Sequence, residues 1–190
     1  LIAIVLVSCS ETPKSIKKEI TSSFVELLKN DVKDDNINGS MSIAIIHKDS
    51  TLVIKSFGKA DTNTIYRIGS ITKSFTGFLM LQLQEDGILN INDPVEKYLP
   101  EIKTLVEYSK FSPITLKQLA SHTSGLDRES RNRSINSGKV NEWEEKVLLG
   151  ISETSFRSKP GERFRYSNIG YAILGLAISK AANKPYIKLV

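Results

Sequence analysis

One stretch of sequence decides the fold: residues 70–83 are Ser70-Ile71-Thr72-Lys73-Ser74-Phe75-Thr76-Gly77-Phe78-Leu79-Met80-Leu81-Gln82-Leu83. If the first four residues open a helix, Lys73 lies one turn beyond Ser70 on the same face, where side chains three positions apart are neighbours. The apolar side chains that follow cover nearly every face of this helix. We therefore expect the helix to be buried all round, with its first turn inside the protein.

A serine and a lysine in contact can carry nucleophilic catalysis. A serine hydroxyl is a weak nucleophile until a base removes its proton, and an amine acts as that base only when it is partly neutral near pH 7. Burial disfavours the ammonium form, and a helix N-terminus disfavours it further while favouring negative charge on Ser70. Taken alone, the tetrad leaves another interpretation open, in which Ser70 caps the helix and Lys73 is solvated.

Composition excludes several classes of function. The 190 residues are 40% hydrophobic and 25% charged, as in an ordinary globular domain or part of one. The net charge of +5 comes from scattered lysines without a basic stripe, so nucleic acid is not an expected partner. Two histidines and one cysteine provide no structural zinc site, and we predict neither metal nor cofactor. The one basic cluster, Arg128, Arg131 and Arg133 beside Asp127 and Glu129, is expected to form a solvated loop.

The sequence begins with an apolar run, Leu1 to Val7, that leads into Ser8-Cys9-Ser10. The run is too short to span a bilayer but suits the end of a signal peptide, and without an initiating Met we expect the sequence to be cut at its front. Leu6-Val7-Ser8-Cys9 resembles the lipobox of bacterial lipoproteins, in which the cysteine carries lipid.

On this interpretation residues 1–9 are a signal-peptide remnant and residues 10–14 a tether. The protein would be anchored through lipid on Cys9 in a membrane of the bacterial cell envelope, facing the periplasm or the exterior. The alternative is a buried Cys9 thiol in a short first strand.

Periodicity predicts helices with one hairpin. Apolar residues at helical spacing predict an amphipathic helix from Ser15 to about Asp31, and two β-branched runs, 41–47 and 51–58, predict a hairpin. Further helices are expected from Ser70 to Gly87, from Pro94 as first helical residue to Tyr98, from Ser112 onward, across 142–149, and from Tyr171 to Ala182.

Several segments together resemble one family, the serine β-lactamase and penicillin-binding protein superfamily, and within it the class C-like β-lactamase-related serine hydrolases. These segments are Arg67 to Phe75, Leu81 to Pro100, Ile114 to Leu126 with its His-Thr-Ser-Gly-Leu loop, and Pro160 to Gly170 with Pro-Gly-x-x-Phe-x-Tyr-Ser-Asn. The resemblance implies an α/β (α+β) fold of the β-lactamase/transpeptidase type, with an antiparallel sheet flanked by helices and a helical subdomain. The domain would cover 15–190, with a helix and hairpin in 15–60 and the catalytic helix and helical subdomain in 66–190.

The resemblance also implies the roles of the site residues. Ser70 would be the acylated nucleophile, and Lys73 would help to deprotonate it. Tyr166 would be the partner base or acid that passes the proton to the leaving group, and Asn168 would bind the substrate amide and help orient Lys73. Because a phenol with a pKa of about 10 becomes a usable base only beside a positive charge, Lys73 and Tyr166 should titrate as a coupled pair. The alternative is an ordinary loop tyrosine packed on the next helix, with a capping asparagine.

The sequence departs from the family at the third motif, a Lys or His followed by Ser or Thr and Gly on a core strand, which does not occur in it. We expect the C-terminal strands to be missing from this chain, together with one donor of the oxyanion hole. Since losing one such donor typically costs roughly 100- to 1,000-fold in rate, we expect these 190 residues alone to be poorly folded or nearly inactive.

The function that the resemblance implies is a serine hydrolase acting through an acyl-enzyme on an amide, ester or β-lactam carbonyl. The substrate would be a small molecule, a β-lactam or a peptidoglycan-derived peptide. Two alternatives stay open: a non-hydrolysing penicillin-binding or peptidoglycan-sensing lipoprotein, and a non-catalytic lipoprotein that uses the fold as an interaction surface. Fold alone does not choose among them.

Overall fold

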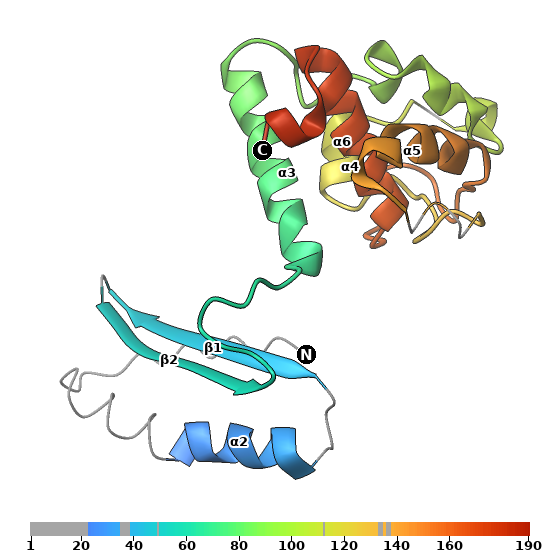
Figure 1. The fold of residues 1–190 in the computed structure, drawn as a ribbon. Coiled ribbons are helices and arrows are strands. Elements are labelled where there is room, and N and C mark those ends of the chain that lie inside the picture. The colour runs from blue at the N-terminus through green and yellow to red at the C-terminus, as the bar shows by residue number, and fades with distance from the viewer. Residues whose placement is uncertain (1–22, 35–38, 49, 112, 133–134, 136–137) are drawn as a thin grey trace. The chain divides into compact units, whose positions relative to one another are not determined.

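The computed structural model divides the chain into two compact units, Leu1–Arg67 and Ile68–Val190 (Figure 1). The residues that the structure describes are 23–34, 39–48, 50–111, 113–132, 135 and 138–190. Cys9 and the predicted start of the first helix at Ser15 lie outside them. None of the helices in the described ranges is both long enough and apolar enough to span a membrane.

The first unit contains helix α2 (Val25–Asp34) and a two-stranded antiparallel sheet of β1 (Ser40–His47) and β2 (Ser50–Gly58). The predicted hairpin is therefore confirmed. Its register runs from Ser40 opposite Gly58 to His47 opposite Ser50, with an irregularity between Ile45 and Ile46. Gly58 has a φ of 69°, and a Cβ there would lie 2.4 Å from the carbonyl oxygen of Gly39, so this end of the hairpin requires glycine.

The second unit is helical and is organised around α6 (Asn168–Ala182), which contacts α3 (Thr72–Glu85), α4 (Leu116–Ala120) and α5 (Trp143–Ser152) (Figure 1). The sequence of α6 is apolar on every face, and its central residues are fully buried. Short 3-10 helices complete the unit: η2 (Gly69–Ile71), η3 (Val95–Lys97), η4 (Pro100–Thr104), η5 (Tyr108–Lys110), η7 (Val140–Glu142) and η8 (Tyr186–Lys188).

Helix α3 buries one face only, which corrects the expectation of a helix buried all round. The buried residues are Thr76, Leu79, Met80 and Leu83, whereas Phe75, Phe78 and Leu81 are exposed. Within the described part of the second unit, α3 packs on α6 from one side, and the hydroxyls of Thr76 and Tyr186 share a 2.6 Å hydrogen bond on that side. Ser70 is also exposed and Lys73 half-buried, so the first turn is accessible.

The short helix predicted from Pro94 to Tyr98 is present as η3, but it begins one residue later, at Val95. Pro94 is extended, with a ψ of 139°, and forms an isolated bridge with Thr115. The N–H of Val95 donates to the carbonyl of Ile114 at 2.8 Å, so strand-like pairing between distant segments replaces the local helical start expected at Pro94. The next helix begins at Leu116, where a capping box of Thr115 and Gln118 fixes its N-terminus. Ser112, the predicted start, lies outside the described residues.

Candidate active site

The nucleophile candidate lies in the first turn of a continuous helical segment. Ser70 belongs to η2, which leads directly into α3, and Gly69 before it has a φ of 55°. The ammonium of Lys73 donates to the Oγ of Ser70 at 3.4 Å, so the contact that their spacing predicts is present. Because the first N–H groups of a helix have no intrahelical partner, we expect the N–H of Ser70 to be open to a substrate oxygen.

Tyr166 reaches the same serine oxygen from a loop far along the chain. This loop ends at α6, whose N-cap is Ser167, and the Tyr166 hydroxyl donates to the Oγ of Ser70 at 2.8 Å. The Nζ of Lys73 lies 5.0 Å from the centre of the Tyr166 ring. The structure therefore brings Ser70, Lys73 and Tyr166 together, and their catalytic roles remain predictions.

Positive charge around Tyr166 favours its ionised form. Hydrogen bonding from the Lys73 ammonium, followed by that with Ser70, lowers the pKa of the Tyr166 phenol below its ordinary value, against the opposing effect of burial. Arg128 adds a smaller electrostatic contribution in the same direction, since its guanidinium lies 5.4 Å from the ring centre. A phenol in this setting is a better proton acceptor near neutral pH than a free tyrosine.

Asn168, the fourth predicted residue, makes a different contact. It is the first residue of α6, and its side-chain amide donates to Glu129 at 2.5 Å, while its backbone N–H donates to the carbonyl of Arg128 at 2.8 Å. Within the described residues no hydrogen bond joins Asn168 to Lys73. The helix cap is Ser167, which accepts from Gly170 at 2.9 Å, so Asn168 does not cap α6.

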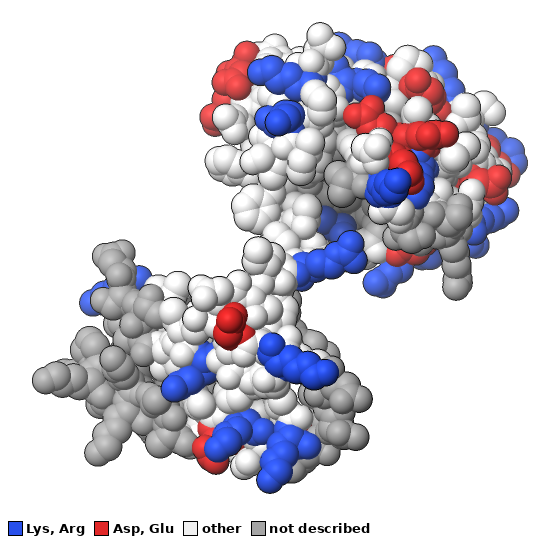
Figure 2. Space-filling view, viewed as in Figure 1, with Lys and Arg blue, Asp and Glu red and all other residues white. Residues whose placement is uncertain are grey.

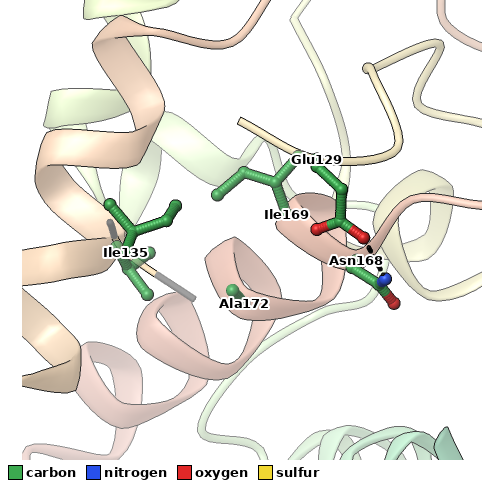
Figure 3. Close-up of a pocket in the computed structure, with 6 residues that line it drawn as sticks. Glu129, Ile135, Asn168, Ile169 and Ala172 are labelled. Atoms are coloured by element: carbon green, nitrogen blue, oxygen red, sulfur yellow. Dashed lines mark hydrogen bonds between the residues drawn. The ribbon is translucent and has the colours of Figure 1, made fainter. Parts of the chain in front are cut away.

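A small cavity of about 100 Å³ adjoins the Asn168–Glu129 pair (Figure 3). Its other lining residues are apolar: Ile135, Val147, Ile169 and Ala172. At the start of α6, the hydrogen bond between Asn168 and Glu129 therefore lies beside a small, mostly apolar cavity.

The loop that follows α4 is solvated at Arg128 and Arg131, as expected for the basic cluster, but not at Asp127, and Arg133 lies outside the described residues. Asp127 and Ser130 are buried, and Asp127 accepts from the Nε of Arg157 at 2.5 Å. Its carbonyl accepts from Ser167 at 2.6 Å, which ties this loop to the start of α6. Arg128 is exposed, as expected, but lies against Tyr166.

Sequence reasoning gave no role to His122 and Tyr171, whose rings line the same site. The ring centre of His122 lies 4.3 Å from that of Tyr166 and 4.8 Å from that of Tyr171. Lys73 lies 5.6 Å from the centre of the Tyr171 ring. The His-Thr-Ser-Gly-Leu motif was the available signal for His122, although local patterns do not show which ring it would contact.

In the ranges that the structure describes, no three His, Cys, Asp or Glu side chains are grouped so that they could hold a metal ion. Figure 2 shows Lys and Arg interspersed with Asp and Glu over the visible face of the second unit.

Comparisons with known proteins identify the family of the chain. A model of the family described as Beta-lactamase matches residues 24–190. Protein flp of Staphylococcus aureus (strain COL) is 34% identical over 173 residues, which are 86% of this chain and 34% of that protein. The chain thus spans about a third of the length of this curated relative.

Solved structures show the same fold. A β-lactamase/D-alanine carboxypeptidase from Yersinia pestis is 30% identical, with a TM-score of 0.59 over 88% of this chain and 52% of that one. A class C β-lactamase in complex with cefoxitin, 22% identical, has a TM-score of 0.70 over 90% of this chain and 47% of that one, a likeness of fold alone. The chain belongs to the Beta-lactamase family, which includes the serine β-lactamases and penicillin-binding-protein-like enzymes that its motifs indicated.

Proposed function

We propose that the protein is a serine hydrolase that forms an acyl-enzyme on Ser70 from an amide or β-lactam carbonyl. One observation carries the proposal: the Nζ of Lys73 and the hydroxyl of Tyr166 both hydrogen-bond the Oγ of Ser70, at 3.4 and 2.8 Å. A hydroxyl held between an ammonium and a phenol of lowered pKa is the arrangement that activates a nucleophile.

The geometry supports the following sequence of proton transfers. Tyr166, ionised beside Lys73, removes the hydroxyl proton of Ser70 while the Oγ of Ser70 bonds to the substrate carbonyl carbon. The carbonyl oxygen gains negative charge, which the N–H of Ser70 at the helix N-terminus stabilises. When the bond to the leaving nitrogen breaks, Tyr166 returns the proton to that nitrogen. Tyr166 then takes a proton from a water molecule as that water attacks the acyl carbon. It returns the proton to the Oγ of Ser70 when the bond between this Oγ and the acyl carbon breaks.

Peptides ending in D-alanine and β-lactams are the proposed substrate classes. The Yersinia pestis protein is described as a β-lactamase/D-alanine carboxypeptidase, and this supports the choice. Asn168 is the first residue of the helix that follows Tyr166, and its side-chain amide donates to Glu129. We expect this amide to leave Glu129 and to hydrogen-bond the substrate amide when a substrate binds.

Anchoring at the cell envelope is also part of the proposal. Leu6-Val7-Ser8-Cys9 supports it, since a diacylglycerol on Cys9 together with an amide-linked chain would exceed the two signals needed for stable membrane attachment. Mass spectrometry of the N-terminal peptide from cells should find a lipidated Cys9. An unlipidated peptide that retains residues 1–8 would contradict the anchor.

The test of the catalytic proposal is acylation of the full-length protein by a fluorescent penicillin. We expect one adduct per protein by intact mass, located on the Ser70 peptide and absent from Ser70→Ala. Release of penicilloate with turnover would support the hydrolase, whereas an adduct stable for hours would favour the non-hydrolysing penicillin-binding alternative. Equal labelling of Ser70→Ala and wild type would contradict both.

A further inference from the structure

His122 holds the backbone on both sides of Tyr166. Its carbonyl accepts from the N–H of Arg165 at 2.6 Å, and its Nδ1 accepts from the N–H of Ser167 at 3.1 Å. Its ring also packs on the Tyr166 ring, at 4.3 Å between centres and 32° between planes. A single residue thus fixes the chain before Tyr166, the chain after it and the face of the phenol.

The imidazole contact requires one protonation state. A nitrogen that accepts from a backbone N–H carries no proton, so the Nδ1 of His122 is bare and the ring is neutral. Protonation of Nδ1 would replace an acceptor by a donor facing the N–H of Ser167. Burial, and then the positive charge of Lys73, lower the pKa of His122 and thereby preserve the neutral form.

Resting on the proposed function, we infer that His122 is a positioning residue for Tyr166: its neutral imidazole and its carbonyl hold the phenol within reach of Ser70. The backbone supports this role, because His122 has a φ of 58°, which directs its side chain and its carbonyl toward the same segment. Displacement of a reacting group by about 1 Å can cost roughly 100-fold in rate, so a lost clamp should reduce acylation without removing the nucleophile.

Other titratable groups surround this histidine. Lys73 faces it from α3, Tyr166 from the loop before α6, and Tyr171 from α6. Arg128 lies over the ring of Tyr166. A histidine changes charge between about pH 5 and 7 at its ordinary pKa, but Tyr166 has a lowered pKa and also shapes the pH profile. The contribution of His122 is therefore the difference between the pH profiles of the wild type and a variant whose residue 122 does not titrate.

The experiment compares His122→Asn with His122→Gly in the full-length protein. Both residues tolerate a positive φ, but only the asparagine side chain keeps an acceptor near the position of Nδ1, and it does not titrate. At pH 8 we expect acylation by fluorescent penicillin to fall about 10- to 100-fold in His122→Gly and about threefold or less in His122→Asn. The fall should be in the acylation rate constant and not in the half-saturating penicillin concentration.

The pH profile supplies a readout that a purely structural role would not move. Because the pKa of His122 is lowered, wild-type acylation should show an additional decrease, beyond that from protonation of Tyr166, at a pH below the ordinary histidine value of about 6.5. His122→Asn should lack this additional decrease. The inference is overturned by equal rates in folded His122→Gly and wild type, or by the same acid limb in His122→Asn and wild type. If His122→Gly does not fold, the profile of His122→Asn decides alone. Absence of any acylation in the wild type would overturn the proposed function and this inference with it.

Discussion

The hydroxyl of Tyr166 donates to the Oγ of Ser70 at 2.8 Å across a sequence separation of 96 positions. Lys73, three positions from Ser70, reaches the same oxygen at 3.4 Å. One oxygen thus receives a long-range contact from a phenol and a local contact from an ammonium. We therefore expect replacement of Tyr166 and replacement of Lys73 to change acylation in different ways.

Tyr166→Phe should keep the fold and lose the chemistry. The hydrogen bond of the Tyr166 hydroxyl is to Ser70, and the change leaves the ring packed on His122. Loss of a general base typically costs about 100- to 10,000-fold, so we expect a loss of this size in acylation by fluorescent penicillin with an unchanged melting temperature. The matched control is Tyr108→Phe, which removes a hydroxyl bonded to Glu96 at 3.1 Å, away from the site. Similar losses in both variants would contradict a specific role for Tyr166.

Lys73→Met should move the pH dependence of acylation. Lys73 is the largest cause that lowers the pKa of Tyr166, and removing its positive charge disfavours the phenolate. The rising limb of the rate, which lies below about pH 10 in the wild type, should shift to higher pH in this variant. Lys73→Arg keeps the charge but offers no base, so its limb should stay near the wild-type position even if its rate falls. An unmoved limb in Lys73→Met would show that the charge does not act on Tyr166.

Local patterns predicted the local part of this site. The spacing of Ser70 and Lys73 predicts their contact because side chains three apart on a helix are neighbours, and the structure has it. The hairpin and the apolar helix α6 likewise follow from periodicity within one segment. Tyr166, by contrast, was a candidate through family resemblance, since no periodic pattern specifies a partner at that distance in sequence.

The wrong predictions share a cause, which is that packing between distant segments decided the outcome. Pro94 pairs with Thr115 and is extended, although Asp-Pro is a good local helix start. The apolar sequence of α3 indicates that most of its side chains could be buried. It does not indicate which faces of the helix the rest of the second unit covers. Asp127 looked solvated among charged residues, yet Arg157 pairs with its carboxylate from 30 positions away.

In Asn168→Asp, the free energy of unfolding should decrease as pH rises. The Asn168 amide donates to Glu129 at 2.5 Å, and an aspartate would place two carboxylates in contact. Their repulsion raises a carboxyl pKa in the folded state above the unfolded value of about 4, so the variant should lose stability as pH rises through that raised pKa. Because the Glu129 side chain is 41% exposed, the loss should be about 1 kcal/mol or less. Urea unfolding at pH 5 and pH 8 measures it, and adding Glu129→Gln should restore the wild-type profile. A loss that persists in the double variant would contradict the pairing.

Asp93→Asn should weaken the fold at neutral pH and not in acid. The Oδ2 of Asp93 accepts from the Lys97 ammonium at 2.8 Å, the Tyr98 hydroxyl at 2.5 Å and the N–H of Asn90 at 3.1 Å. Lys97 and then Tyr98 lower the pKa of this carboxyl, so its stabilisation is fully present above the unfolded value of about 4 and is lost as pH falls through the lower folded value. Since an amide oxygen accepts these bonds more weakly, we expect a cost of about 1 kcal/mol at pH 7 that shrinks toward zero below about pH 3. Urea unfolding at both pH values tests this, with Glu101→Gln as an exposed acidic control. A cost of equal size at the two pH values would show that packing of residue 93, and not its charge, stabilises the segment.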